Sequence, residues 1–147
     1  MSSKRQGIVQ HVKAGLLAAN TAAGQRVHTQ RKLPADLKEL PLLLVFALHE
    51  EVTDDALLGQ PRSYGRELLL VVIGIAAGQA EDLEGELDGL ALGIEQVMQA
   101  DESQGGQARA TVLQSTDFDL DEDGPLPLGA VILTYQVTYR APDIPGE

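Results

Sequence analysis

The residues most suggestive of chemistry are four aspartates that alternate along one stretch, Asp117, Asp119, Asp121 and Asp123. Alternating carboxylates followed by glycine are typical of calcium-binding loops, and Gly124 follows the last of them. A loop of that kind starting at Asp119 needs a bidentate glutamate at its twelfth position, where this chain has Ala130. The pattern therefore favours a solvated acidic hairpin tip, or a contact surface for a basic partner, over a metal site.

The three histidines, His11, His28 and His49, fall on three separate expected elements, and no two have the local spacing of metal ligands. His49 stands beside Glu50 and Glu51, where an apolar stretch gives way to charge. This position is typical of a buried strand reaching the surface. We therefore expect neither a catalytic nor a metal-binding histidine.

No nucleophile or cofactor motif is visible in the sequence. The chain has no cysteine, and its serines lack the Gly-x-Ser-x-Gly context of a nucleophile elbow. No glycine-rich loop follows a strand and opens a helix, which is where a phosphate would be held. We therefore expect a protein that is not an enzyme, has no catalytic residues, and binds no cofactor and no metal.

The charge of the chain is divided between two parts. Residues 1–40 carry a net charge of +5, whereas residues 41–147 carry −16, for a total of −11. This total disfavours tight binding to nucleic acid, because phosphate groups attract basic proteins. Parts of opposite sign can orient a subunit on complementary neighbours; the alternative is that the charge serves only solubility.

Length and composition predict a single domain in residues 1–147. The chain is 44% hydrophobic but only 3% aromatic, so its core is expected to consist of Leu, Val, Ile and Ala. The two most apolar stretches, residues 40–48 and 68–77, are shorter than the roughly 20 residues that cross a bilayer. We expect no membrane segment, and no signal peptide either, because no long apolar run follows the first residues.

Hydrophobic spacing predicts two helices. In residues 6–19 an apolar side chain recurs every fourth position, and in residues 80–100 the spacing alternates between four and three. Gly85, Gly89 and Gly93 lie on a different face of the second helix, where glycine lowers helix stability. That face is either a close contact for another subunit or a tolerated weakness.

Five strands are expected, at residues 25–29, 42–48, 66–79, 108–120 and 130–140. The second and third are apolar on both faces, which indicates interior strands, and a turn-rich loop over residues 53–65 joins them. The last two form a hairpin around residues 121–129. These elements predict an α+β fold, with a mixed but mainly antiparallel sheet of four to five strands and two helices packed on it.

The order of these segments carries a resemblance to a known family. The segments that carry it are, in chain order, the helix Gln6 to Ala19 followed by Gly24-Gln25-Arg26-Val27, the strand Leu42 to Glu50, the segment Glu67 to Val72, the acidic helix start Ala80-Glu81-Asp82-Leu83, and the strand Ala130 to Tyr139. In this order the chain resembles the phage tail terminator, or tail completion, proteins, the family of the lambda-like minor tail protein U. The resemblance covers nearly the whole chain.

The resemblance implies a structural virion protein located at the tail–head junction and assembled in the host cytoplasm. Six copies would form a ring on the tail tube protein, stop tube polymerisation and present a surface to a neck or head-completion protein. DNA would pass through the acidic lumen without specific binding. The alternatives are a neck or head-completion protein and, less favoured, a small ligand-binding domain or enzyme.

Two sets of contact residues are expected for such an assembly. The loop over residues 53–65, with Arg62 and Tyr64, is expected to contact a neighbouring subunit or the tail tube. Asp119, Asp121 and Asp123 are expected to face the lumen or the partner on the head side.

Overall fold

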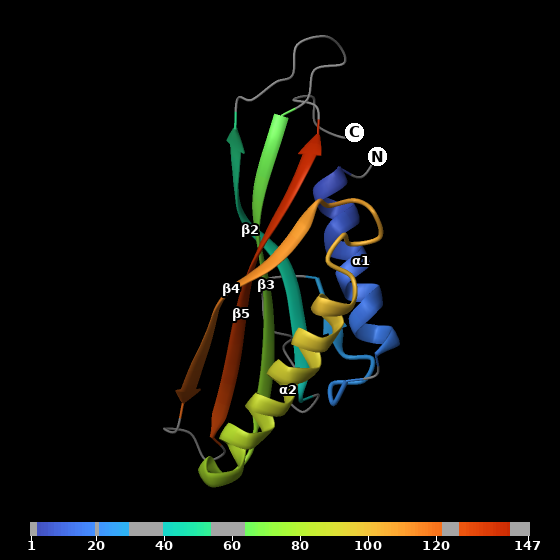
Figure 1. Ribbon diagram of the computed structural model, residues 1–147. Coiled ribbons are helices and arrows are strands. Elements are labelled where there is room, and N and C mark those ends of the chain that lie inside the picture. Colours follow the sequence, from blue (N-terminus) through green and yellow to red (C-terminus); the bar gives the residue numbers. More distant parts are fainter. Residues whose placement is uncertain (1–2, 20, 30–39, 54–63, 122–126, 142–147) are drawn as a thin grey trace.

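The described residues form one mixed sheet with two helices on the same face (Figure 1). The computed structural model describes residues 3–19, 21–29, 40–53, 64–121 and 127–141. Their elements are α1 (Lys4–Ala18), β1 (Val27–His28), β2 (Leu42–Thr53), β3 (Tyr64–Ala77), α2 (Ala80–Ala100), β4 (Ala110–Asp121) and β5 (Leu128–Ala141). The predicted α+β class is confirmed.

Both helices form where the sequence places an apolar stripe. The stripe of α1 is buried and consists of Ile8, Val9, Val12 and Leu16. Ser3 caps this helix, because its hydroxyl accepts a hydrogen bond from the backbone N–H of Gln6 at 3.2 Å. The predicted bounds of α2 are confirmed, and α1 begins two residues before the predicted start.

The sheet has the strand order β1-β2-β3-β5-β4. Every pairing is antiparallel except that of β1, which runs parallel to β2 at Leu43 and Leu44. The predicted interior position of β3 is confirmed, since β2 and β5 flank it along its length. The second half of β2 and the whole of β4 form the two margins of the sheet, and each margin strand contains a bulge.

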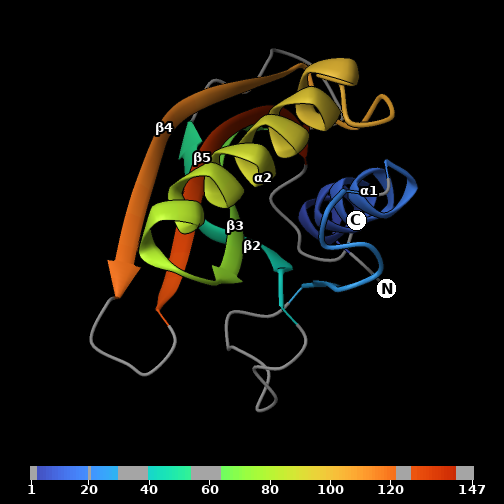
Figure 2. The ribbon, with the colours of Figure 1, turned by 90° about the horizontal axis from the view of Figure 1, so that it is seen from below.

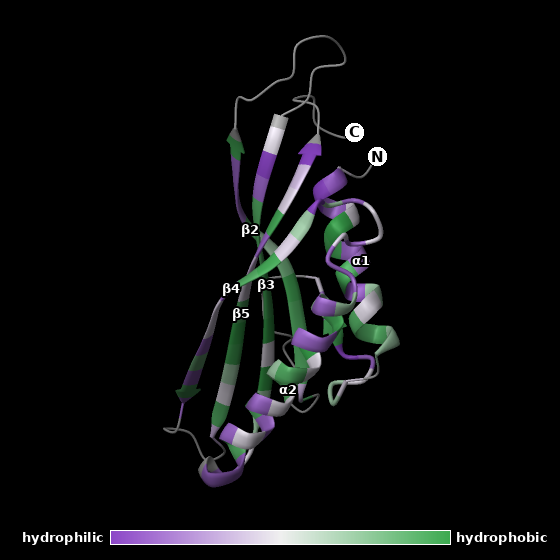
Figure 3. Cartoon of the chain, viewed as in Figure 1, coloured by the Kyte–Doolittle hydropathy of each residue, from purple (hydrophilic) through white to green (hydrophobic). Residues whose placement is uncertain are grey.

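Alternation along the strands divides the core between the two faces of the sheet. The larger cluster lies beneath the helices and includes Leu68, Leu70, Val72, Leu133 and Val137. A smaller cluster of Leu42, Leu44 and Ile75 lies on the opposite face. Figure 2 shows α1 beside β2 and α2 across β3 and β5, and Figure 3 shows that the part of β3 and β5 beneath α2 is predominantly apolar.

Glycine allows α2 to approach the sheet closely. A Cβ atom added to Gly129 of β5 would lie 2.7 Å from Cδ1 of Leu87 and 2.9 Å from Cδ2 of Leu120. A Cβ added to Gly74 of β3 would lie 3.2 Å from Leu90. The glycines at these two positions determine how closely α2 packs against β3 and β5. They thereby also determine the distance between α2 and β4.

Candidate interaction surfaces

The residues predicted to make contacts are only partly described by the structure. Arg62 and Asp123 lie outside the described residues, as do residues 54–63 of the loop that joins β2 to β3. Tyr64 is the first residue of β3, but its side chain also lies outside the described part. The predicted contact role of this loop therefore stays a prediction.

Asp119 and Asp121 belong to β4, not to a turn. They pair with Ala130 and Leu128 of β5, so the strand continues one residue beyond its predicted end and the expected hairpin tip begins later. The reason is the alternation of acidic and apolar residues, which a strand accommodates on its two faces. Asp119 and Asp121 share the face turned away from the helices, together with Asp117.

The described aspartates Asp117, Asp119 and Asp121 belong to no cluster with metal-ligand geometry. Among the described residues, no group of three or more His, Asp or Glu side chains could hold a metal ion. The described helices also include none that is long and apolar enough to cross a membrane.

The three histidines have different surroundings. His11 of α1 forms a 2.8 Å hydrogen bond with Asp101, and His49 of β2 forms one of the same length with Glu51. His28 of β1 is part-buried, and its Nε2 has no partner among the described residues. The hydrogen bond with His11, followed by the one from Ser103, lowers the pKa of Asp101 below its usual value. The His11–Asp101 bond joins the middle of α1 to the C-terminal end of α2, whereas the His49–Glu51 bond lies within β2.

A polar cluster centred on Glu50 of β2 joins α1 to the sheet. Arg5 of α1 and Arg66 of β3 donate to Oε2 of Glu50 at 2.7 and 2.9 Å, and the hydroxyl of Tyr139 in β5 donates to Oε1. Burial alone would raise the pKa of Glu50, but the hydrogen bonds from Tyr139 and Arg66 and the charge of Arg5 outweigh it. Its pKa is therefore lower than usual, and the carboxylate stays ionised.

A cavity of about 700 Å³ lies between α1 and α2. Small residues make up much of its lining, among them Gly15, Ala18, Ala19, Gly93 and Ala100. The His11–Asp101 pair also lines it, and the buried hydroxyl of Thr21 has no partner among the described residues. The hydroxyl of Ser103 donates to Oδ1 of the same Asp101 at 2.9 Å, so the histidine and the serine both bond to one carboxylate.

The two margins of the sheet expose large apolar side chains. Leu48 and Val52 of β2 are 49% and 52% exposed, and Val112 and Phe118 of β4 are 53% and 54% exposed. Leu92 of α2 is the one other exposed large hydrophobic among the described residues. No described strand pairs with residues 48–52 on the side away from β3, or with residues 110–120 on the side away from β5. Both margins are therefore suited to adding another strand.

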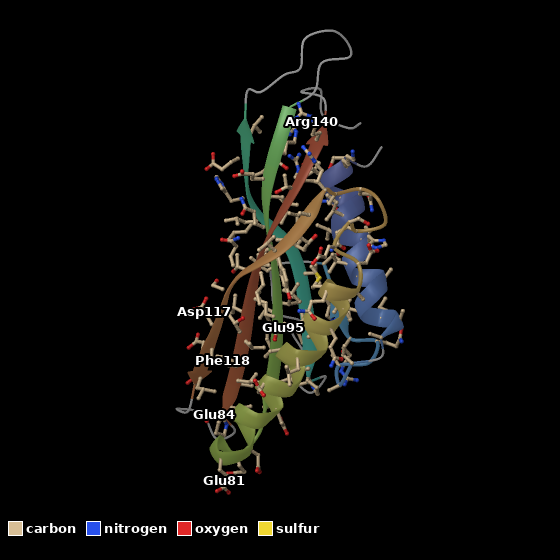
Figure 4. All side chains as sticks on the ribbon, viewed as in Figure 1. Glu81, Glu84, Glu95, Asp117, Phe118 and Arg140 are labelled. Atoms are coloured by element: carbon tan, nitrogen blue, oxygen red, sulfur yellow. The ribbon has the colours of Figure 1, made fainter. Side chains whose placement is uncertain are left out.

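A groove runs between α2 and β4 near the end of the molecule where α2 begins. We call it the α2–β4 groove, and it has a volume of about 480 Å³ and is lined by Glu84, Gly85, Leu87, Asp88, Phe118 and Leu120. Figure 4 shows Glu84 and Phe118 toward the end of the molecule where α2 begins, with Glu81 nearer that end and Asp117 nearer the middle. The groove thus has an apolar floor with carboxylates around it.

Sequence reasoning found the acidic residues of this region but missed the apolar ones. Phe118 is one of only two phenylalanines, and it lies between Asp117 and Asp119 in a strand otherwise dominated by polar residues. An aromatic residue isolated among carboxylates was the available signal for an exposed apolar position. Val112 and Val52 carried no such signal, because their exposure depends on strand order.

Comparison with known proteins identifies no family. No family model matches the chain, and no curated protein matches it. Among solved structures, one chain of a structure described as "Virion of native gene transfer agent (GTA) particle" is similar, with 13% sequence identity and a TM-score of 0.44. The similarity covers 92% of this chain and 95% of that chain. A likeness at this level assigns no function, so the surfaces described above must indicate one.

Proposed function

We propose that this chain is a structural virion protein that forms a ring on the end of a phage tail tube, stops tube polymerisation and provides the surface for joining the head. The element order, which resembles that of tail terminator proteins, supports the tail assignment. The observation that supports ring formation is that both opposite edges of the sheet, the second half of β2 and β4, expose large apolar side chains.

The two margins are different surfaces, and this difference favours a ring. If the β4 margin of one copy meets the β2 margin of the next, each copy uses two unlike patches, and such head-to-tail contacts close into rings or continue as filaments. If the two margins paired as neighbouring strands, the backbone N–H and C=O groups of both edge strands would form hydrogen bonds, and Val52 and Val112 would become less exposed. Carboxylates elsewhere on the surface suit a lumen that repels DNA.

Self-association can be measured on the purified chain. Native mass spectrometry and sedimentation velocity over a concentration series are expected to show a closed oligomer, with six copies as the expected number. The Val112→Lys and Val52→Lys variants are expected to remain folded and monomeric, because a lysine on an edge strand opposes strand pairing. Leu92→Lys is the matched control, since Leu92 is equally exposed but lies on α2.

The tail role needs a second measurement. Co-expression with the tail tube protein from the same genome is expected to give tubes that carry a ring at one end and stop growing, as seen by negative-stain microscopy. The Val112→Lys variant is expected to leave tubes uncapped and of unlimited length. Uncapped tubes with the unaltered chain, or full capping by both margin variants, would contradict the proposal. Binding to DNA-filled heads without capping would favour a neck or head-completion protein instead.

A further inference from the structure

We propose that the α2–β4 groove binds a basic segment of a partner protein, which inserts one apolar side chain against Phe118. This interaction is additional to ring formation, because it uses the space between α2 and β4 and not the backbone edge of β4. Three features of the groove support it: an exposed aromatic ring, a missing side chain opposite that ring, and charge of a single sign.

The aromatic ring lies on the side of the sheet that the helices cover. Phe118 pairs with Val131, whose side chain is fully buried beneath α2, yet Phe118 remains 54% exposed. The neighbouring Leu120 is only partly exposed and packs against the core. Phe118 therefore lies on the helix-covered side of the sheet but stays half exposed, and together with Leu87 and Leu120 it gives the groove an apolar lining that a partner side chain can contact.

The opposite wall of the groove lacks a side chain. A Cβ atom added to Gly85 would meet no atom within 4 Å, so a larger residue fits there without strain. Glycine nevertheless stands inside a helix, where alanine is more stable. The absence of a side chain keeps the space beside Phe118 open, and its volume of about 480 Å³ suits the anchoring side chain of a peptide and its neighbours.

The charge around the groove identifies the partner as basic. α2 and β4 carry nine carboxylates between them and no lysine or arginine. Four ion pairs formed between described residues are Arg5–Glu50, His11–Asp101, His49–Glu51 and Arg66–Glu50, and none of these four involves Glu84 or Asp88. Glu84 and Asp88 can therefore pair with cations from outside, whereas a nucleic acid would be repelled.

The experiment measures binding of a defined peptide to the full chain. The probe is a fluorescein-labelled nonapeptide with a central leucine, flanked on each side by two lysines or arginines spaced by glycine. A second peptide replaces the leucine with alanine and keeps the charge. Fluorescence anisotropy is expected to show saturable binding of the leucine peptide, weaker binding of the alanine peptide, and loss of affinity as salt rises.

Variants of the groove separate specific binding from general attraction to an acidic protein. Phe118→Ala is expected to weaken the leucine peptide at least about fivefold, as for an aromatic anchor, and to change the alanine peptide little. Glu84→Gln with Asp88→Asn is expected to weaken both peptides about three- to tenfold. The matched control is Glu67→Gln with Glu102→Gln, which removes two exposed carboxylates outside the groove and keeps binding near that of the unaltered chain.

Two glycine variants keep the proposal testable if Phe118→Ala folds poorly. Gly85→Leu fills the groove, whereas Gly89→Leu adds the same side chain one turn further along α2, and neither added Cβ meets an atom within 4 Å. Only Gly85→Leu is expected to block the leucine peptide. Equal effects of the two glycine variants, or equal affinity for the two peptides, would overturn the proposal. So would a peptide that binds only by dissociating oligomers, because the groove would then belong to a second copy.

Discussion

Glu50 is held between two guanidinium groups, and its charge contributes to stability over a defined pH range. Its side chain is 9% exposed, and its pKa in the folded protein is lower than the ordinary value of 4.5. A lowered pKa means that the ionised form stabilises the fold. This contribution is complete above pH 4.5 and is lost as pH falls through the lower folded value.

Replacing Glu50 tests this contribution. Glu50→Gln is expected to reduce the free energy of unfolding by about 3 kcal/mol at pH 7, because Arg5 and Arg66 lose their counter-charge. Urea unfolding between pH 7 and pH 3 would measure it, and the variant is expected to lose less stability than the unaltered chain below pH 4.5. Glu51→Gln is the control, since Glu51 is 70% exposed and its change is expected to stay within about 0.5 kcal/mol. Similar losses in the two variants would contradict the assignment.

Two tyrosines on β5 provide a matched pair of hydroxyl deletions. The hydroxyl of Tyr139 donates to Glu50, whereas the buried hydroxyl of Tyr135 has no partner among the described residues. Tyr139→Phe is expected to destabilise the fold by about 1–2 kcal/mol, because it removes a hydrogen bond to a charged group. Tyr135→Phe is expected to be neutral or stabilising, since it removes a buried polar atom that lacks a partner. Denaturant midpoints would compare them, and a larger loss for Tyr135→Phe would be the contrary result.

At the level of elements, the glycines of α2 and β5 have opposite roles. Gly85 and Gly89 are exposed in a helix interior with no atom near an added Cβ, so alanine at either position is expected to stabilise the protein by about 0.5–1 kcal/mol. Gly129→Ala is expected to destabilise it, because the new Cβ would lie 2.7 Å from Leu87. Thermal unfolding of the three variants would test this; stabilisation by Gly129→Ala would show that α2 can move away from β5.

The elements were largely predictable from the sequence, whereas the surfaces were not. α2 was predicted at its observed bounds, because a long amphipathic stripe is a local signal. The strand order was not predicted, since the pairing of β3 with β5 joins residues far apart in the chain. Without that order, β4 and the second half of β2 could not be recognised as margins, and the exposure of Val52 and Val112 could not be foreseen. The exposure of Phe118 could not be predicted either, because it depends on how closely α2 packs against β5.

The whole molecule has two unlike margins, and mixing variants tests whether they meet each other. Val52→Lys blocks the β2 margin and Val112→Lys blocks the β4 margin, so each variant alone is expected to be monomeric. An equimolar mixture still contains one intact margin of each kind and is expected to form heterodimers that go no further. Native mass spectrometry of variants that differ in mass would detect them. Homodimers of either variant would instead indicate a symmetric contact between identical margins.

The contact between Lys4 and Arg140 has a practical consequence. Nζ of Lys4 donates a hydrogen bond to the backbone carbonyl of Arg140 at 3.0 Å. This bond connects the first turn of α1 to the C-terminal end of β5. The α2–β4 groove lies at the far end of the sheet (Figures 1 and 4). A fluorophore or affinity tag joined before α1 or after β5 would therefore be attached at the end of the subunit opposite the α2–β4 groove. The groove would then stay accessible in surface immobilisation, microscopy and binding measurements.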